Sequence, residues 1–111
     1  MTEKFPQPAP ALSTRQKQFL KALAHPMTPL VLIGKEGLSP AVLATIDKEL
    51  AHHELLKVKI GNNSGVERHE TSATIASASD SSLVQVIGKT IVLYRPNPDK
   101  PKERRIVLPK R

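Results

Sequence analysis

Apolar residues recur at helical spacing early in the chain, in residues 14–24. Ser13 and Gln16 have the form of a capping box, in which each side chain accepts a hydrogen bond from the other residue's backbone N–H. At about 100° per residue, three apolar side chains fall on one side of such a helix and two lysines share the opposite side. The apolar side chains are Phe19, Leu20 and Leu23, and the lysines are Lys17 and Lys21. The pattern predicts a helix that packs by one face and is basic on the other.

A short apolar run, a loop and a second helix come next. Residues 30–33 are wholly apolar, which is typical of a strand that is covered on both faces. After a Gly-Lys-Glu-Gly loop, Ser39 is a suitable N-cap, and Pro40 suits the first helical position because no backbone N–H is needed there. The pattern predicts a helix from Pro40 to about His52. Its apolar stripe consists of Val42, Leu43, Ile46 and Leu50.

The second half of the chain contains three strand patterns and one weaker helix pattern. Strict alternation predicts a strand at residues 56–60, with Leu56, Val58 and Ile60 toward a core and Lys57 and Lys59 on the other face. Residues 83–95 contain two β-rich runs around Gly88-Lys89, as a type II′ hairpin prefers. Residues 66–82 allow a helix, but their many Ser and Thr lower its propensity.

These elements predict one α/β domain with a four-stranded mixed sheet packed with helices. Strand–helix–strand crossovers place their strands in parallel, whereas the final hairpin is antiparallel. We expect a flexible arm at residues 1–12, a folded domain at residues 13–96 and a basic, proline-rich tail at residues 97–111. The run Ile106-Val107-Leu108 could pack on the domain or extend a sheet edge, and the sequence leaves both possibilities open.

The net charge of +7 is concentrated near the C-terminus. Residues 95–111 contain seven Lys and Arg against two acidic residues, a net charge of +5. Composition alone therefore does not assign nucleic-acid binding to the folded body. A tail that serves only solubility is the alternative interpretation.

Other features of the composition exclude several classes of protein. The chain has no cysteine, which excludes disulfides, thiolate metal sites and cysteine nucleophiles. Its aromatic residues are only Phe5, Phe19 and Tyr94, so stacking of bases can contribute little. The sequence contains neither a signal peptide nor an apolar run long enough for a membrane span. We expect a cytoplasmic protein with no membrane partner.

No arrangement of residues favours catalysis. His52 and His53 are adjacent on the predicted helix and therefore diverge, and no cysteine completes a zinc site. Asp47 and Glu49 are two residues apart on the same helix and cannot act on one substrate. The Ser-rich residues 72–82 have no nucleophile-elbow pattern. We therefore expect no enzyme, no metal, no cofactor and no small-molecule substrate.

The Gly34-Lys35-Glu36-Gly37 loop allows two interpretations. It is too short for a Walker motif, and Gly-x-x-Gly is common where a strand turns tightly into a helix. Glycines also let a backbone come close to a phosphate, with amide N–H groups at the helix start and the charge of Lys35. A similar loop clamps single-stranded nucleic acid in KH domains. The sequence alone leaves both interpretations open.

Three stretches together resemble one family. TRQKQFLKALAHPMTPLVLIGKEGLS, ELLKVKI and VQVIGKTIVLYRP are similar to the CRM domain, named for chloroplast RNA splicing and ribosome maturation, in its bacterial single-domain, YhbY-like form. The resemblance covers residues 13–96 and implies a fold similar to the C-terminal domain of a bacterial translation initiation factor. It also implies RNA binding, with the family's proposed contact loop at Gly34, Lys35, Glu36 and Gly37. The family carries a more charged third helix than TSATIASASDSS, so no contact is carried over to that segment.

The resemblance also implies a role. Bacterial stand-alone members are associated with precursors of the large ribosomal subunit, whereas multi-domain plant relatives help to splice introns, and 111 residues fit only the stand-alone role. We expect a monomer that binds ribosomal RNA through phosphates, with backbone amides from Lys35 to Leu38 in contact. Most of five basic residues should join this loop in one patch, and the tail should add affinity. The five are Arg15, Lys17, Lys21, Lys57 and Lys59. The alternative is an adaptor whose basic surface binds an acidic ribosomal or assembly protein.

Overall fold

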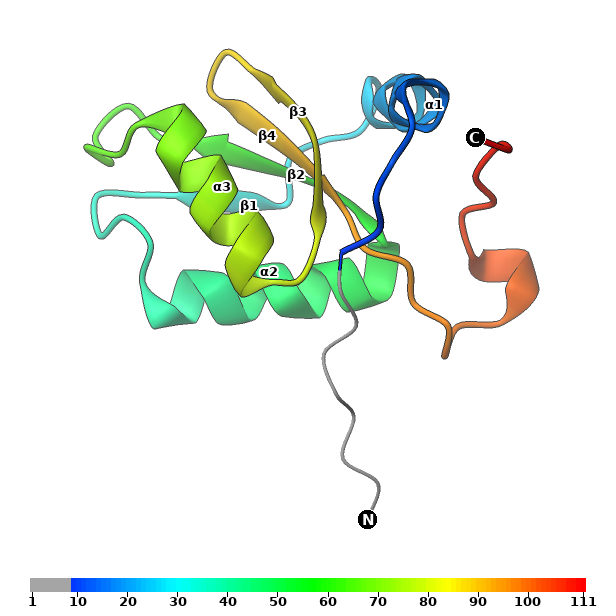
Figure 1. Cartoon of the computed structure of the whole chain (residues 1–111). Coiled ribbons are helices and arrows are strands. Elements are labelled where there is room, and N and C mark those ends of the chain that lie inside the picture. Colours follow the sequence, from blue (N-terminus) through cyan, green and yellow to red (C-terminus); the bar gives the residue numbers. More distant parts are fainter. Residues whose placement is uncertain (1–8) are drawn as a thin grey trace.

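The computed structural model of the chain describes residues 9–111 and shows a four-stranded mixed sheet with helices on both faces (Figure 1). The predicted α/β fold is thereby confirmed, while most of the predicted N-terminal arm lies outside the described residues. In chain order the elements are α1 (Thr14–Ala24), β1 (Val31–Ile33), α2 (Pro40–His53), β2 (Leu55–Ile60), α3 (Arg68–Ala78), β3 (Ser82–Ile87), β4 (Thr90–Tyr94) and the short 3-10 helix η1 (Lys102–Arg104). The strand order is β1-β2-β4-β3, with β1 parallel to β2 and the other neighbours antiparallel.

The sheet separates two cores. On one face, α2 and α3 cover the apolar side chains of all four strands, and on the other face α1 packs over β2, β3 and β4 (Figure 1). The first core consists of Val31, Ile33, Ile46, Leu50, Leu56, Val58, Ile60, Ile75, Ile91 and Leu93. The second core consists of Leu20, Ala24, Leu55, Val84, Val92 and Tyr94. The predicted alternation in β2 is confirmed, since Leu56, Val58 and Ile60 all lie in the first core.

The start of α1 is as predicted, but its packing face is not. Ser13 N donates to Gln16 Oε1 at 3.1 Å and Gln16 N donates to Ser13 Oγ at 3.2 Å, which confirms the capping box. The buried side chains of α1 are Gln16, Leu20 and Ala24. Phe19 and Leu23, predicted to pack, remain 36% and 40% exposed. Gln16, Leu20 and Ala24 are four residues apart, so they lie on one face of the helix, and this face packs on the sheet. It is rotated to one side of the face that the apolar pattern predicted.

The prediction that β1 is covered on both faces is wrong. Leu32 is 61% exposed, although its neighbours Val31 and Ile33 are buried. The reason is that β1 is an edge strand, whereas α1 packs over β2, β3 and β4. One face of the sheet therefore remains open beside α1.

The remaining predicted elements are present. Ser39 Oγ accepts from Val42 N at 3.2 Å, and α2 runs from Pro40 to His53, one residue beyond its predicted end. Gly88 has a φ of 57° at the first position of the hairpin turn, as predicted. The weak pattern at residues 66–82 contains a helix, α3, because Ile75 and its buried neighbours pack on the sheet.

The tail (residues 97–111) packs against the body and does not extend the sheet. Ile106 and Leu108 contact the second core, while Val107 is exposed. Figure 1 shows this segment beside α1, with the C-terminus near the helix. Of the two possibilities that the sequence left open, the structure therefore has the first.

A buried carboxylate holds the tail in place. Glu54 follows α2, is only 1% exposed, and has a φ of 64°, in the left-handed region. Its Oε2 accepts from Asn97 N at 2.7 Å and its Oε1 accepts from Ile106 N at 2.7 Å. These two donors offset the cost of burying the charge. We call this arrangement the Glu54 clamp.

No helix in the described part of the chain, residues 9–111, is long and apolar enough to cross a membrane.

Candidate functional site

The loop between β1 and α2, residues 34–37, is called the glycine loop below. Gly37 N donates to Gly34 O at 2.9 Å, which closes the turn. Gly37 has a φ of 67°, so the turn requires a glycine there. Gly34 lies outside the left-handed region, and a Cβ built on it would meet no atom within 4 Å. The turn interpretation therefore explains Gly37 but gives no reason for Gly34.

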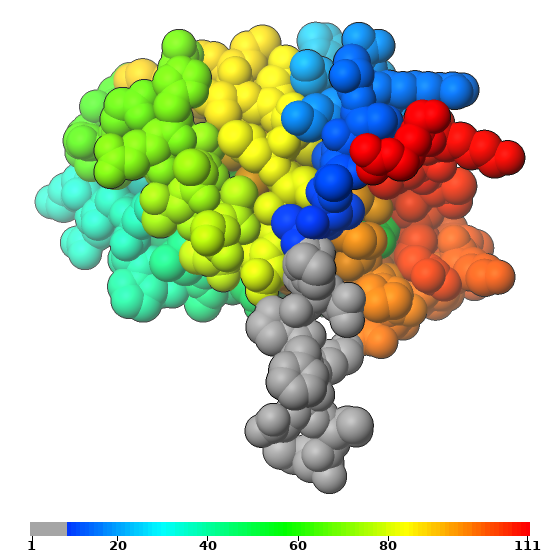
Figure 2. All heavy atoms as spheres, in the orientation of Figure 1, coloured from blue at the N-terminus to red at the C-terminus, as the bar shows by residue number. Residues whose placement is uncertain are grey.

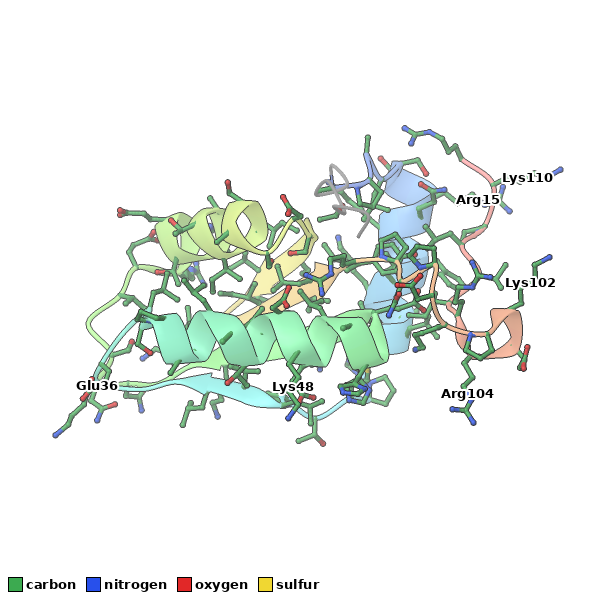
Figure 3. All side chains as sticks on the ribbon, turned by 90° about the horizontal axis from the view of Figure 1, so that it is seen from below. Arg15, Glu36, Lys48, Lys102, Arg104 and Lys110 are labelled. Atoms are coloured by element: carbon green, nitrogen blue, oxygen red, sulfur yellow. The ribbon has the colours of Figure 1, made fainter. Side chains whose placement is uncertain are left out.

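Several backbone donors of this loop are available to a ligand. Within residues 9–111, the backbone N–H groups of Lys35, Glu36 and Leu38 make no hydrogen bond. The side chains of Lys35 and Glu36 are exposed, and Glu36 lies at one extreme end of the molecule (Figure 3). Lys35 and Glu36 offer two adjacent free amides in the loop that precedes α2, and successive backbone N–H groups suit an anionic oxygen such as that of a phosphate.

The loop after β2 is bound closely to the end of β1. Gly61 N donates to Ile33 O at 2.8 Å, and a Cβ on Gly61 would lie 2.9 Å from that same oxygen. The position therefore requires a glycine for close approach. This contact fixes residues 61–65 beside the glycine loop, since Ile33 directly precedes Gly34.

The β3–β4 hairpin turn brings two further cations to this end of the sheet. Ile60 N donates to Lys89 O at 2.7 Å, and Lys89 Nζ donates to Asn62 Oδ1 at 2.5 Å. Arg68 Nη1, from the first turn of α3, donates to Gly88 O at 3.0 Å. Sequence reasoning missed Arg68 and Lys89. The sequence indicates Lys89 only as a turn residue, and its position beside Lys59 follows from the pairing of Lys59 with Thr90, which the sequence does not show.

A row of four side chains crosses the open face of the sheet at the same end. Leu32 pairs with Lys59, Lys59 with Thr90, and Thr90 with Ile87. Leu32 and Ile87 are 61% and 57% exposed, and Lys59 is exposed between them. The structure thus places Lys59 near the glycine loop. We call the four cations of this end the loop surface: Lys35, Lys59, Arg68 and Lys89.

Lys57 and Lys21 lie together in a hollow between α1 and the sheet, which His25, Gln85 and Ile87 also line. Lys57 Nζ donates to His25 O and Met27 O, both at 3.1 Å. These carbonyls follow the end of α1, so Lys57 stabilises the helix C-terminus. A structural role thus accounts for Lys57 without a ligand.

The expectation that the basic residues form one patch with the loop is wrong for Arg15. Figure 3 shows Arg15 at the end of the molecule opposite Glu36, close to Lys110. The reason is that α1 crosses the sheet at some distance from the glycine loop, and Arg15 lies in its first turn. Lys17, also in the first half of α1, is exposed.

Residues 12–95 match the family model of the CRS1 / YhbY (CRM) domain. The chain belongs to this family. A protein of Haemophilus influenzae named RNA-binding protein is 46% identical over 104 residues, which cover 90% of this chain and 97% of that protein. Bacillus subtilis has a relative named "Probable RNA-binding protein YqeI", 37% identical over 84 residues, which cover 76% of this chain and 88% of that protein.

A solved structure has the same fold as this CRM domain. The solution structure of protein SAV1595 from Staphylococcus aureus, provisionally described as RNA binding, superposes with a TM-score of 0.73 at 39% sequence identity. The match covers 89% of this chain and all of the other. The resemblance seen in three stretches of sequence is thereby confirmed.

In this CRM domain the N-terminus of α3 differs from that of α2. Glu67 Oε2 accepts from Glu70 N at 2.7 Å, so the helix carries its own anion. Hydrogen bonds from the backbone N–H groups of Glu70 and His69 hold the pKa of Glu67 below its ordinary value. An external phosphate therefore fits the glycine loop at the start of α2 better than the start of α3.

Among the described residues of the chain, 9–111, no three His, Asp or Glu side chains are grouped as metal ligands would be.

Proposed function

We propose that this CRM domain binds RNA and acts in the cytoplasm as a non-enzymatic assembly factor on precursors of the large ribosomal subunit. The names of its relatives and the resemblance of its sequence support the RNA partner. The observation that carries the proposal is the glycine loop, whose free amides lie at the same end of the sheet as the cations of the loop surface.

The arrangement suits contact with phosphates. The backbone N–H groups of Lys35, Glu36 and Leu38 would donate to phosphate oxygens, and Lys35 would neutralise their charge. Gly34 has no side chain, so the RNA backbone can approach the loop closely. Tyr94 is buried and Phe19 lies on α1, so base stacking has little place at this end of the sheet.

The first test compares two lysine variants. Lys35→Gln should lower affinity for structured ribosomal RNA fragments, regardless of their sequence, because it removes a phosphate contact. Lys48→Gln is the matched control, since Lys48 is exposed on α2 away from the loop (Figure 3). Fluorescence anisotropy over a series of salt concentrations measures both affinity and its salt dependence. Lys35→Gln should also reduce the slope of log K against log salt by roughly 0.7 to 0.9.

The result that contradicts a phosphate contact at the loop is equal binding by the two variants, or a salt response that stays flat in the wild type. Loss of stability in Lys35→Gln without loss of affinity would restore the interpretation as a plain turn.

The role in assembly needs a separate measurement. Gradient sedimentation of cell extract, with detection of this protein, should show co-migration with a large-subunit precursor that is lost on RNase treatment. Co-migration that survives RNase would instead support an adaptor that binds an acidic ribosomal or assembly protein. A position at the top of the gradient at both low and moderate salt would exclude stable association.

A further inference from the structure

A second group of cations lies at the end of the molecule opposite the glycine loop. Figure 3 shows Arg15, Lys102 and Lys110 on one side of the molecule and Glu36 of the loop at the far side. These three cations and Arg104 are exposed. We call the four residues the tail surface: Arg15, Lys102, Arg104 and Lys110. In Figure 2 the tail, in orange and red, forms one side of the molecule next to α1.

Three of the four cations of the tail surface belong to the tail, which is a fixed segment, and Arg15 belongs to α1. The Glu54 clamp holds the backbone of the tail at Asn97 and Ile106. Lys100 Nζ donates to His52 O at 2.8 Å, which ties the segment to the end of α2. Gln16 Nε2 donates to Pro109 O at 3.0 Å, which ties it to α1. Because the backbone is already ordered, binding to this surface costs less conformational entropy than binding to a flexible basic tail.

The two cationic surfaces are separated and point in opposite directions. The molecule measures 39 × 37 × 21 Å, and Figure 3 shows α2 running between its two ends. On this side the basic character is interrupted, because Asp47 and Glu49 lie on α2. Asp47 is paired with Arg95 at 2.7 Å, and Glu49 with His53 at 3.3 Å. An RNA segment shorter than the separation of the two ends therefore cannot contact both surfaces at once.

The chemistry of the tail surface suits a phosphate backbone. The tail contains six Lys and Arg against two acidic residues, a net charge of +4 out of +7 for the chain, and no aromatic residue on which a base could stack. Lys102, Arg104 and Lys110 make no side-chain hydrogen bond within residues 9–111, so their charges are available to a partner.

We propose that the tail surface binds a second RNA segment, so that one copy of the protein joins two segments of folded RNA. The inference rests on the proposed function, since it takes RNA as the partner of the glycine loop. It adds a second, separate contact and a bridging action. A protein that joins two RNA segments in this way would stabilise contacts between parts of an RNA that are distant in its sequence.

Stoichiometry with a short RNA tests the proposal. The probe is a stem-loop RNA that is too short to span the 39 Å of the molecule. Isothermal titration or native mass spectrometry should show two stem-loops per wild-type protein. The triple variant Lys102→Gln/Arg104→Gln/Lys110→Gln should bind one, because the glycine loop is unchanged. Lys35→Gln should weaken the other site, and Lys48→Gln, the control, should still bind two.

A capture experiment tests bridging directly. One stem-loop is immobilised and a second, labelled stem-loop is added with the protein. The wild type should retain the labelled RNA, and the tail triple variant should lose it while still binding the immobilised RNA. Retention by the tail variant would overturn the proposal and point to dimers that bind through two loops. Circular dichroism should confirm that the variant is folded, which is expected because the clamp residues are unchanged.

The other outcomes separate this inference from the proposed function. A wild type that binds one stem-loop and bridges none overturns the inference but leaves RNA binding at the loop intact. The same holds if affinity rises with RNA length without bridging, since that result indicates one continuous surface. A wild type that binds no RNA overturns the proposed function as well. The wild type could instead retain a protein partner after nuclease treatment that the tail triple variant loses, while both proteins bind the same number of stem-loops. That result would overturn the inference and assign the tail surface to a protein partner.

Discussion

The two glycines of the loop show how single residues separate a structural requirement from a functional one. Gly37 has a left-handed backbone that other residues adopt only with strain, and its role in the turn is sufficient to explain it. Gly34 has neither a left-handed backbone nor a close neighbour. The sequence motif presents both glycines as equivalent, whereas the structure assigns them different roles.

Substituting each glycine by alanine should therefore have opposite effects. Gly37→Ala should lower the free energy of unfolding by about 1–2 kcal/mol because of backbone strain. Gly34→Ala should not lower stability, and could raise it by about 0.4–1 kcal/mol through the unfolded state, but it should weaken RNA binding by obstructing the approach of the backbone. Urea denaturation and anisotropy measure the two effects. Unchanged RNA affinity in Gly34→Ala would argue against close contact at that position.

At the scale of the elements, the position of the tail depends on Glu54, a residue that lies outside the tail. Glu54 follows α2 by one residue, yet its carboxylate satisfies two backbone donors of a segment more than forty residues later in the chain. Its left-handed backbone turns the chain from α2 into β2, and the carboxylate is placed under the tail. The packing of Ile106 and Leu108 on the second core follows from this geometry.

Removing the clamp should release the tail. Glu54→Ala leaves the N–H groups of Asn97 and Ile106 without their acceptor, so we expect a loss of about 2–4 kcal/mol in the free energy of unfolding. Hydrogen exchange at these two amides should accelerate. Glu49→Ala is the control, because Glu49 lies on α2 and, within residues 9–111, pairs with His53 near the surface, and should cost less than about 1 kcal/mol. Equal losses in both variants would show that the clamp does not stabilise the tail.

At the level of the whole molecule, the second core links stability to alkaline pH through Tyr94. Burial, and secondarily the nearby Glu54 carboxylate, raises the pKa of the Tyr94 hydroxyl above its ordinary value. In the unfolded chain this hydroxyl ionises at about pH 10. The contribution of Tyr94 to the free energy of unfolding is therefore complete below about pH 10. It is lost as the pH rises further, because the hydroxyl then loses its proton more readily in the unfolded chain than in the folded chain.

The stability of the wild type should consequently fall more steeply above about pH 10 than that of Tyr94→Phe. Urea denaturation at several pH values measures the difference between the two proteins, which removes the shared contribution of the lysines. The chain has one tyrosine and no tryptophan, so the ultraviolet absorbance of tyrosinate reports Tyr94 alone. A titration of the folded protein at the ordinary pKa would contradict the prediction.

Local signals were sufficient to predict α1, α2 and the four strands, whereas α3 was only weakly indicated and η1 was not predicted. The capping box of α1, the Ser39-Pro40 start of α2, the alternation in β2 and the Gly88 turn depend on residues at most four apart, and their physical causes act within one turn or one strand pair. The fold class follows from the order of these elements, and the family from the resemblance of three stretches of sequence. The glycine loop was visible in the sequence, but which of its amides are free was not, because they lie before the first turn of α2.

The arrangement of the charges, in contrast, was decided by packing. Which side of α1 is buried depends on its contact with the sheet, and this contact separates Arg15 from the glycine loop. Arg68 and Lys89 lie at the same end of the sheet as that loop because strand register brings the hairpin turn beside the end of β2. Register and packing depend on contacts between residues far apart in the chain, for which a single sequence carries no local signal. The sequence therefore determined the elements and their charges, and the tertiary structure placed those charges on two opposite surfaces.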